Sequence, residues 1–207
     1  EGIDIMLAID VSTSMLAEDL KPNRLEAAKD VAAEFINGRP NDNIGITLFA
    51  GETFTQCPLT VDHAVLLDMI HNIKCGLITD GTAVGMGIAN AVTRLKDSKA
   101  KSKVIILLTD GTNNKGDISP MTAAEIAKSF GIRVYTIGVG TNGMAPYPYP
   151  VGNTVQYVSM PVEIDEKTLT EIAGTTDGNY FRATSNSKLK EVYEEIDKLE
   201  KTKLNVK

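Results

Sequence analysis

Residues 3–14 read IDIMLAIDVSTS, an apolar run that ends in a cluster of short, oxygen-bearing side chains. The run Ile3–Ile9 is interrupted only by Asp4, and this pattern predicts a buried β-strand. A second run, Val104–Leu108, is five consecutive aliphatic residues followed by Thr109 and Asp110. Such runs are typical of strands in a parallel sheet, where helices cover both faces.

The remainder of the chain alternates between segments with the pattern of a strand and segments with the periodicity of a helix. Strands are expected at Ile3–Ile9, Ile44–Ala50, Thr53–Thr60, Val104–Leu108, Ile132–Val139 and Asn179–Ala183. Helical periodicity is seen at Arg24–Asn37, Val61–Ile73, Ala83–Leu95, Met121–Phe130, Glu166–Ala173 and Lys188–Lys203. This alternation requires right-handed crossovers, and it predicts a doubly wound, three-layer α/β/α fold with a mainly parallel sheet. Gly51-Glu52 is expected to turn the chain so that Thr53–Thr60 becomes an antiparallel edge strand.

One segment departs from the pattern. Thr141–Asp165 contains Pro146, Pro148, Pro150 and Pro161 with tyrosines between them. Proline excludes helix, so an irregular insertion is expected, with a small hairpin around Thr154–Ser159. The chain shows no internal repeat and no low-complexity linker, so all 207 residues are expected to form a single domain.

The composition limits the classes of function. A net charge of -6 and a pI near 5.0 argue against a nucleic-acid surface, which requires clustered basic residues. Cys57 and Cys75 are too few for a disulfide framework, although they could pair with each other. The chain begins at Glu1, enters a strand almost at once, and has no apolar run long enough to span a bilayer. It is therefore expected to be a fragment of a longer protein.

Polar side chains gather where three segments end. The first strand leads into Asp10, Ser12 and Ser14, the strand Val104–Leu108 leads into Asp110, and Thr82 immediately precedes a helix. Ligands of open parallel sheets bind beyond the carboxyl ends of the strands, so these side chains are expected to converge. Each of them alone is more readily explained as a helix cap, but their joint occurrence favours a metal site.

Two carboxylates and three hydroxyls, without Cys or His, form a hard oxygen site. Such a set suits Mg²⁺, Mn²⁺ or Ca²⁺ rather than Zn²⁺ or Cu²⁺. Only two carboxylates would face the dication, which leaves a coordination position for an Asp or Glu of a partner protein. The Pro/Tyr-rich insertion follows the strand Ile132–Val139, so Tyr147 and Tyr149 are expected to border that surface and to contribute specificity.

Asp10-x-Ser12-x-Ser14, Thr82 after Gly81, and Leu108-Thr109-Asp110-Gly111 resemble the metal-ion-dependent adhesion site of von Willebrand factor A domains. The resemblance implies that Ser12 and Ser14 bind the cation directly. It implies that Thr82, Asp10 and Asp110 bind the cation directly or through water. It also implies that the C-terminal helix can move in concert with the metal loops. Thr13 stands where the family often has glycine, and its side chain is expected to point away from the site.

A narrower similarity covers nearly the whole chain. Segments such as Lys21–Lys29, Leu48–Glu52, Lys103–Asn114 and Tyr135–Thr141 resemble the BatA and BatB proteins of bacterial aerotolerance operons. This resemblance implies a domain held at the bacterial inner membrane by segments outside this chain. It further implies partners among other Bat proteins or a MoxR-type AAA+ ATPase.

Two other functions are compatible with these residues. Asp10 could be the nucleophile of a Mg²⁺-dependent phosphoryl-transfer enzyme, because such enzymes also place an Asp after the first strand. The expected second acid is replaced by Ser12, and the acidic pair and late Lys of a receiver domain are not evident. A metal-free scaffold is the other alternative. Gly138-x-Gly140-x-x-Gly143 is not a dinucleotide site, because Pro-rich sequence rather than a helix follows it.

Overall fold

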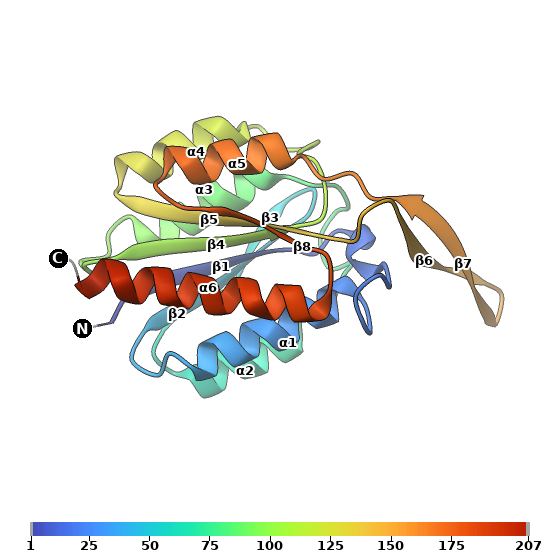
Figure 1. Ribbon diagram of the computed structural model, residues 1–207, viewed down its shortest axis with the longest axis horizontal. Coiled ribbons are helices and arrows are strands. Elements are labelled where there is room, and N and C mark those ends of the chain that lie inside the picture. Colours follow the sequence, from blue (N-terminus) through green and yellow to red (C-terminus); the bar gives the residue numbers. More distant parts are fainter. Residues whose placement is uncertain (1, 206–207) are drawn as a thin grey trace.

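The computed structural model describes residues 2–205, which form a three-layer α/β/α fold around a six-stranded sheet (Figure 1). The strands are β1 (Asp4–Asp10), β2 (Asn43–Phe49), β3 (Thr53–Thr60), β4 (Lys103–Thr109), β5 (Ile132–Val139) and β8 (Tyr180–Ala183). Their order is β3-β2-β1-β4-β5-β8, and only the edge strand β3 is antiparallel to its neighbour. The predicted fold class and the antiparallel edge strand are therefore confirmed.

Helices cover both faces of the sheet (Figure 1). One face carries α1 (Arg24–Asn37), α2 (His63–His71) and α6 (Asn186–Asn205). The other carries α3 (Val84–Leu95), α4 (Pro120–Ser129) and α5 (Glu166–Thr175). Strand β1 shows why two layers are needed, since Ile5, Leu7 and Ile9 enter one core while Met6 and Ala8 enter the other. Every residue of β1 is consequently buried, as the apolar run Ile5–Ile9 predicts for all but the two terminal aspartates.

The helix boundaries differ from the sequence expectations by a few residues because capping side chains set them. Asp62 accepts a hydrogen bond from the Val65 N–H, so α2 begins at His63 rather than at Val61. Ser119 caps α4 in the same way, with Pro120 in its first turn. In α3, Gly85 is required by packing, since a Cβ there would lie 2.1 Å from the Ile118 carbonyl oxygen.

The insertion is more regular than predicted. Strands β6 (Met144–Val151) and β7 (Thr154–Pro161) form an antiparallel hairpin that extends beyond the sheet (Figure 1). Its turn is Gly152-Asn153, and Gly152 has a φ of +59°, a conformation that glycine adopts without strain. The expectation of an irregular segment was wrong for Met144–Val151, because alternate prolines fit an edge strand whose outward positions need no N–H donor.

Three features of the chain complete this description. Cys57 and Cys75 are free thiols, so the pairing left open above is absent. His63 and His71 lie on α2, and the His63 ring makes a hydrogen bond with the backbone carbonyl of Asp42. Within residues 2–205, no helix combines the length and apolar character needed to cross a membrane.

Candidate metal centre

The site is built where the strand order reverses. Strands β1 and β4 are parallel neighbours, and the chain proceeds from β1 to β2 on one side while β4 lies on the other. Asp10 ends β1 and Asp110 follows the end of β4, so the pairing of Ile9 with Leu108 places both carboxylates at the same sheet edge. This arrangement is the switch point at which open α/β sheets bind ligands.

The Asp10–Ser14 loop folds back on itself through hydrogen bonds. One oxygen of Asp10 accepts a bond from the Ser12 N–H at 2.8 Å, and the other accepts one from the Thr109 hydroxyl at 2.8 Å. The hydroxyls of Ser12 and Ser14 are 2.9 Å apart, and that of Ser14 donates to Asp110 at 2.8 Å. Four of the five predicted ligands thus belong to one hydrogen-bonded cluster.

Thr82 reaches the cluster from the loop before α3. Its N–H donates to the Asn114 side chain at 2.9 Å, and its carbonyl accepts from the Asn114 N–H at 2.9 Å. Its hydroxyl lies 3.7 Å from the position that a Cβ on Gly111 would occupy, next to Asp110. Ser14, Thr82 and Asp110 border a common cavity of about 620 Å³. The structure therefore brings together all five residues that the sequence singled out.

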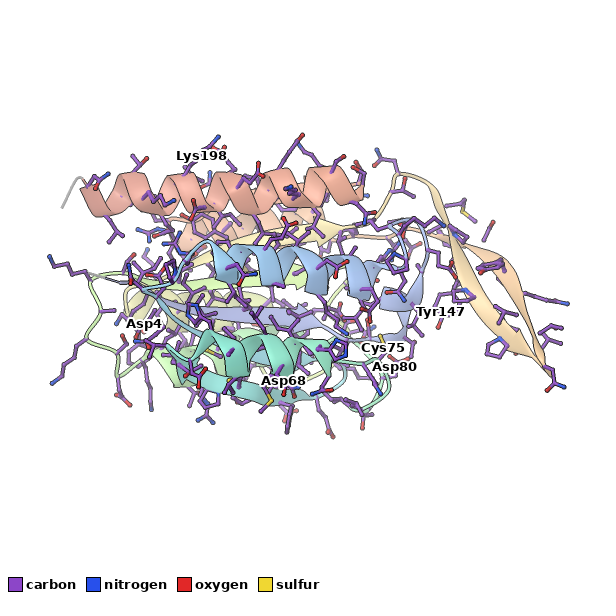
Figure 2. The ribbon with its side chains drawn as sticks, turned by 90° about the horizontal axis from the view of Figure 1, so that it is seen from below. Asp4, Asp68, Cys75, Asp80, Tyr147 and Lys198 are labelled. Carbon is purple, nitrogen blue, oxygen red and sulfur yellow. The ribbon has the colours of Figure 1, made fainter. Side chains whose placement is uncertain are left out.

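Thr13 and Asp80 hold the loop from outside. The Thr13 hydroxyl and N–H donate to Asp80 at 2.8 and 3.1 Å, although Thr13 also lines the cavity beside Ser14 and Asp110. Figure 2 shows Asp80 and Cys75 at the same end of the molecule as Tyr147, with Asp4 at the other end. Asp80 is thus an acceptor that positions the Asp10–Ser14 loop.

Sequence reasoning assigned no role to Arg24, which is the first residue of α1. Its guanidinium group is buried, donates to Asp110 at 2.8 Å, and makes two further bonds, each of 2.7 Å, to Asp19. A basic residue in the first turn opposes the helix dipole, so a buried acidic partner could have been anticipated. Asn113 was also missed, and it accepts a hydrogen bond from the Val84 N–H at the start of α3.

The electrostatics of the cluster are unbalanced. Burial, reinforced by the neighbouring Asp110 carboxylate, raises the pKa of Asp10 to about 7. Burial also raises the pKa of Asp110, although Arg24 opposes that shift. Arg24 is shared between Asp19 and Asp110, and the third buried carboxyl group, Asp10, accepts its hydrogen bonds from Ser12 and Thr109. A bound dication would relieve this repulsion and permit both ligating carboxyl groups to ionise.

The donor set fits a hard cation. Within residues 2–205, no three His, Cys, Asp or Glu side chains are grouped as metal ligands, so a metal here depends on hydroxyl oxygens. Serine and threonine hydroxyls with two carboxylates suit Mg²⁺, Mn²⁺ or Ca²⁺. In this structure the two serine hydroxyls bind each other and that of Ser14 donates to Asp110, so their oxygens already lie close enough together to face one ion.

The hairpin borders the same cavity. It is lined by Ala145 and Tyr147 of β6 and by Met160 and Pro161 of β7, together with Ser14, Thr82 and Asp110. The expected position of Tyr147 is confirmed. Tyr149 lies farther along the hairpin, is 56% exposed and does not line the cavity, so its contribution to specificity stays a prediction.

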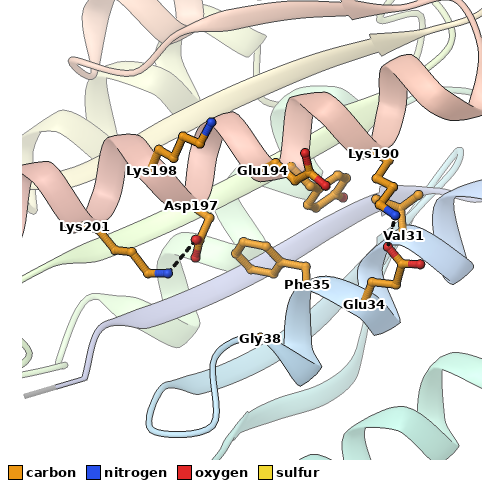
Figure 3. A pocket seen from close by; sticks show the side chains of 10 residues that line it. Val31, Glu34, Phe35, Gly38, Lys190, Glu194, Asp197, Lys198 and Lys201 are labelled. Carbon is orange, nitrogen blue, oxygen red and sulfur yellow. Dashed lines mark ion pairs between the residues drawn. The ribbon is translucent and has the colours of Figure 1, made fainter.

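A second cavity, of about 370 Å³, lies between α1 and α6 (Figure 3). Phe35 and Tyr193 form its apolar part, and Lys190, Glu34, Asp197 and Lys201 surround them. The charged side chains pair with each other, with Lys201 2.8 Å from Asp197 and Lys190 3.8 Å from Glu34. This groove therefore offers no unbalanced charge comparable with that at Asp10 and Asp110.

Comparisons with known proteins agree with this architecture. The profile of the von Willebrand factor type A domain matches residues 4–195. A solved BatB structure from Bacteroides thetaiotaomicron is 34% identical with a TM-score of 0.83, covering 97% of this chain and all of that one. An aerotolerance-related membrane protein from Bacteroides fragilis is 32% identical with a TM-score of 0.83, covering 95% of this chain and 98% of that one.

More distant and longer proteins also match. A mussel byssus protein, proximal thread matrix protein 1 with a zinc-occupied adhesion-site motif, shares the fold at 24% identity and a TM-score of 0.74 over 96% of this chain and 45% of that one. A UPF0353 protein of Nocardia farcinica is 32% identical over 93% of this chain. The chain spans only 59–62% of the length of such curated relatives.

Proposed function

Because the chain belongs to the von Willebrand factor type A domain family, we propose that it is a divalent-cation-dependent protein–protein interaction module. Asp10, Ser12, Ser14, Thr82 and Asp110 would hold the cation, with Mg²⁺ as the favoured ion and Mn²⁺ or Ca²⁺ as substitutes. The carrying observation is the unbalanced carboxylate pair, whose oxygens and neighbouring hydroxyls converge beside an open cavity. When bound, the cation supplies an electrophilic centre that a partner's carboxylate can ligate.

An acidic partner residue follows from the charge on the ligands. Asp110 already gives one oxygen to Arg24, which reduces the negative charge it can offer a cation. Asp10 is fully buried behind the serine hydroxyls and does not line the cavity. The cavity side of the ion would therefore face mainly neutral hydroxyl groups, and an Asp or Glu of a partner is the favoured ligand for that side.

We also propose that the domain belongs to a Bat-type protein anchored in the bacterial inner membrane. Support comes from the two Bacteroides structures, one of which is named as an aerotolerance-related membrane protein. The roughly 40% of each relative that this chain does not span would contain the anchor. Other Bat proteins or a MoxR-type AAA+ ATPase are the proposed partners.

The phosphoryl-transfer alternative is less well supported. A nucleophilic carboxylate must present an oxygen to its substrate, whereas Asp10 has no exposed surface. Both of its oxygens accept hydrogen bonds, from the Ser12 N–H and the Thr109 hydroxyl. These contacts favour a residue that ligates or positions over one that attacks, and we propose a non-enzymatic role.

The decisive experiment measures cation affinity and partner capture together. Titration calorimetry with Mg²⁺ and Mn²⁺ is expected to show binding to the wild-type domain and none to Asp110→Ala. Asp117→Ala is the matched control, since Asp117 is an exposed acid on the same loop. Capture of Bat proteins from solubilised membranes should require Mg²⁺ and be lost with chelator. Unchanged cation affinity in Asp110→Ala would refute the site, and a metal-independent melting temperature would favour the scaffold alternative.

A further inference from the structure

The hairpin has two unlike edges. On the outer edge of β6, Pro146, Pro148 and Pro150 recur at every second position and supply no N–H groups. The Pro146 carbonyl accepts a hydrogen bond from the Glu18 N–H at 2.8 Å, which shows that these positions face away from β7. The β6 edge therefore cannot accept another strand, because its outward donors are missing and its base is already in contact with the domain.

The β7 edge is open. Ser159, Tyr157 and Val155 lie directly opposite Pro146, Pro148 and Pro150 in the ladder. Residues opposite each other in an antiparallel pair are either both bonded or both turned outward, so these three point their N–H and C=O groups away from β6. None of those groups has a hydrogen-bond partner among residues 2–205. They form a short row of free donors and acceptors.

Both faces of the hairpin are apolar and exposed. Tyr149 and Val158 are 56% and 46% exposed on one face, and Tyr157 and Val155 are 58% and 57% exposed on the other. The hairpin extends beyond the helices (Figure 1), and the Tyr157 hydroxyl donates a hydrogen bond of 3.4 Å to Glu18 of the domain. An isolated two-stranded hairpin is only marginally stable, and exposed apolar surface of this kind marks a site of protein interaction.

We propose that the β7 edge binds an extended segment of a partner protein, which adds as a third strand beside Val155, Tyr157 and Ser159. Backbone hydrogen bonds would supply affinity, and alternate side chains would contact the apolar faces. Beyond Ser159, the strand continues into Met160 and Pro161, which line the cavity beside Ser14, Thr82 and Asp110. An acidic residue at that end of the partner strand would reach the metal, and this clause rests on the proposed function.

The occupant is a different protein rather than a second copy of this chain. A symmetric pairing of two hairpins would bring β7 against β7. Residues 154–161 read TVQYVSMP and contain no Asp or Glu. A second copy would thus satisfy the open edge but would present no carboxylate from β7 to the cavity. A partner strand of alternating apolar residues that ends in Asp or Glu would pair with the open edge and also bring a carboxylate to the cavity.

The test uses peptides selected from a phage-displayed library of about ten random residues, long enough to span one strand. Selection in Mg²⁺ against the whole chain should yield alternating apolar sequences with a terminal acid. Ser159→Pro and Tyr157→Pro each remove one outward N–H while copying the prolines opposite them, and each should weaken binding about fivefold. Ser159→Ala and Tyr157→Ala retain the N–H. They are the matched controls for loss of the side chain alone.

N-methylation of the selected peptide gives a readout that needs no change in the protein. Methylation at alternate residues should abolish binding, and methylation at the intervening residues should be tolerated, because only every second amide faces β7. Uniform tolerance of N-methylation, equal effects of the proline and alanine variants, or failure to select any peptide would overturn the β7-edge proposal. A concentration-dependent dimer that Ser159→Pro abolishes would overturn the choice of occupant.

Chelator separates this proposal from the metal site. If chelator and Asp110→Ala abolish peptide binding while both proline variants bind normally, the edge proposal fails and the metal-dependent function stands. If the proline variants weaken binding but chelator has no effect, the edge is used and the metal-dependent function fails. If chelator and the proline variants both weaken peptide binding, the result supports one continuous surface from the metal centre to β7.

Discussion

The two ends of the sheet contain buried charge clusters that differ in balance. At the amino end, the Glu200 carboxylate of α6 pairs with Arg133 at 3.0 Å and accepts bonds from the hydroxyls of Tyr135 and Ser102. At the carboxyl end, Arg24 pairs with Asp19 and Asp110, while the buried Asp10 accepts hydrogen bonds from Ser12 and Thr109. The Glu200 carboxylate is neutralised by Arg133 and needs no added ion to stabilise the fold. The unbalanced cluster is the one suited to an external ion.

The largest effect is expected at the balanced end. Glu200→Ala should lower the free energy of unfolding by about 3–5 kcal/mol, because it leaves Arg133, whose side chain is 11% exposed, without its partner. Denaturant titration measures this loss, and Glu194→Ala, an exposed acid on the same helix, is the control. Cation affinity should not change. An equal loss in the two variants would contradict the structural role of Glu200.

Removal of a charge at the carboxyl end should lower cation affinity without lowering the stability of the fold. Asp10→Asn should reduce Mg²⁺ affinity by at least about a hundredfold, or about 2.7 kcal/mol, as measured by calorimetry. Stability without metal should stay the same or increase, since the variant removes one of two mutually repelling carboxyl groups. Strong destabilisation of metal-free Asp10→Asn would show that Asp10, like Glu200, stabilises the fold without a bound ion.

Added metal should stabilise only through the unbalanced end. Mg²⁺ at ten times its dissociation constant should raise the free energy of unfolding by about 1.4 kcal/mol, and chelator should reverse the change. Thermal melting of wild type and Asp10→Asn, each with and without Mg²⁺, gives the comparison. A similar increase in the variant would place the ion elsewhere on the protein.

The smallest effect concerns Asp19 and pH. Burial raises its pKa, but hydrogen bonds from Arg24 and from the Thr141 N–H outweigh burial and lower it below the usual value. The stabilisation is therefore fully present above the unfolded-state pKa, near 3.9, and is lost as pH falls through the lower folded-state pKa. Denaturation at stepped pH values should show a smaller acid dependence for Asp19→Asn than for wild type. Parallel curves would exclude this contribution.

That the proposed ligand residues lie close together was predictable, because their positions follow from signals within a few residues of each. Asp10 and Asp110 directly follow apolar runs, and parallel strands end at a common sheet edge, so the two had to lie close together. Thr82 was identified by its place before a helix. The alternate prolines already imply that these positions face away from a paired strand, but which strand pairs with β6, and that the far edge of β7 stays open, is visible only in the structure.

The sequence by itself determined the alternation of strands and helices outside the insertion, the two-faced burial of β1 and β4, and the five oxygen-bearing residues proposed as ligands. These depend on periodicity and spacing, which act over a few residues. Only the tertiary structure decided that Arg24 pairs with Asp110 across 86 positions and that Glu200 closes on Arg133 across 67. It alone left β7 with an open edge beside the cavity. Such pairings depend on where whole elements pack, and no local pattern in the sequence encodes them.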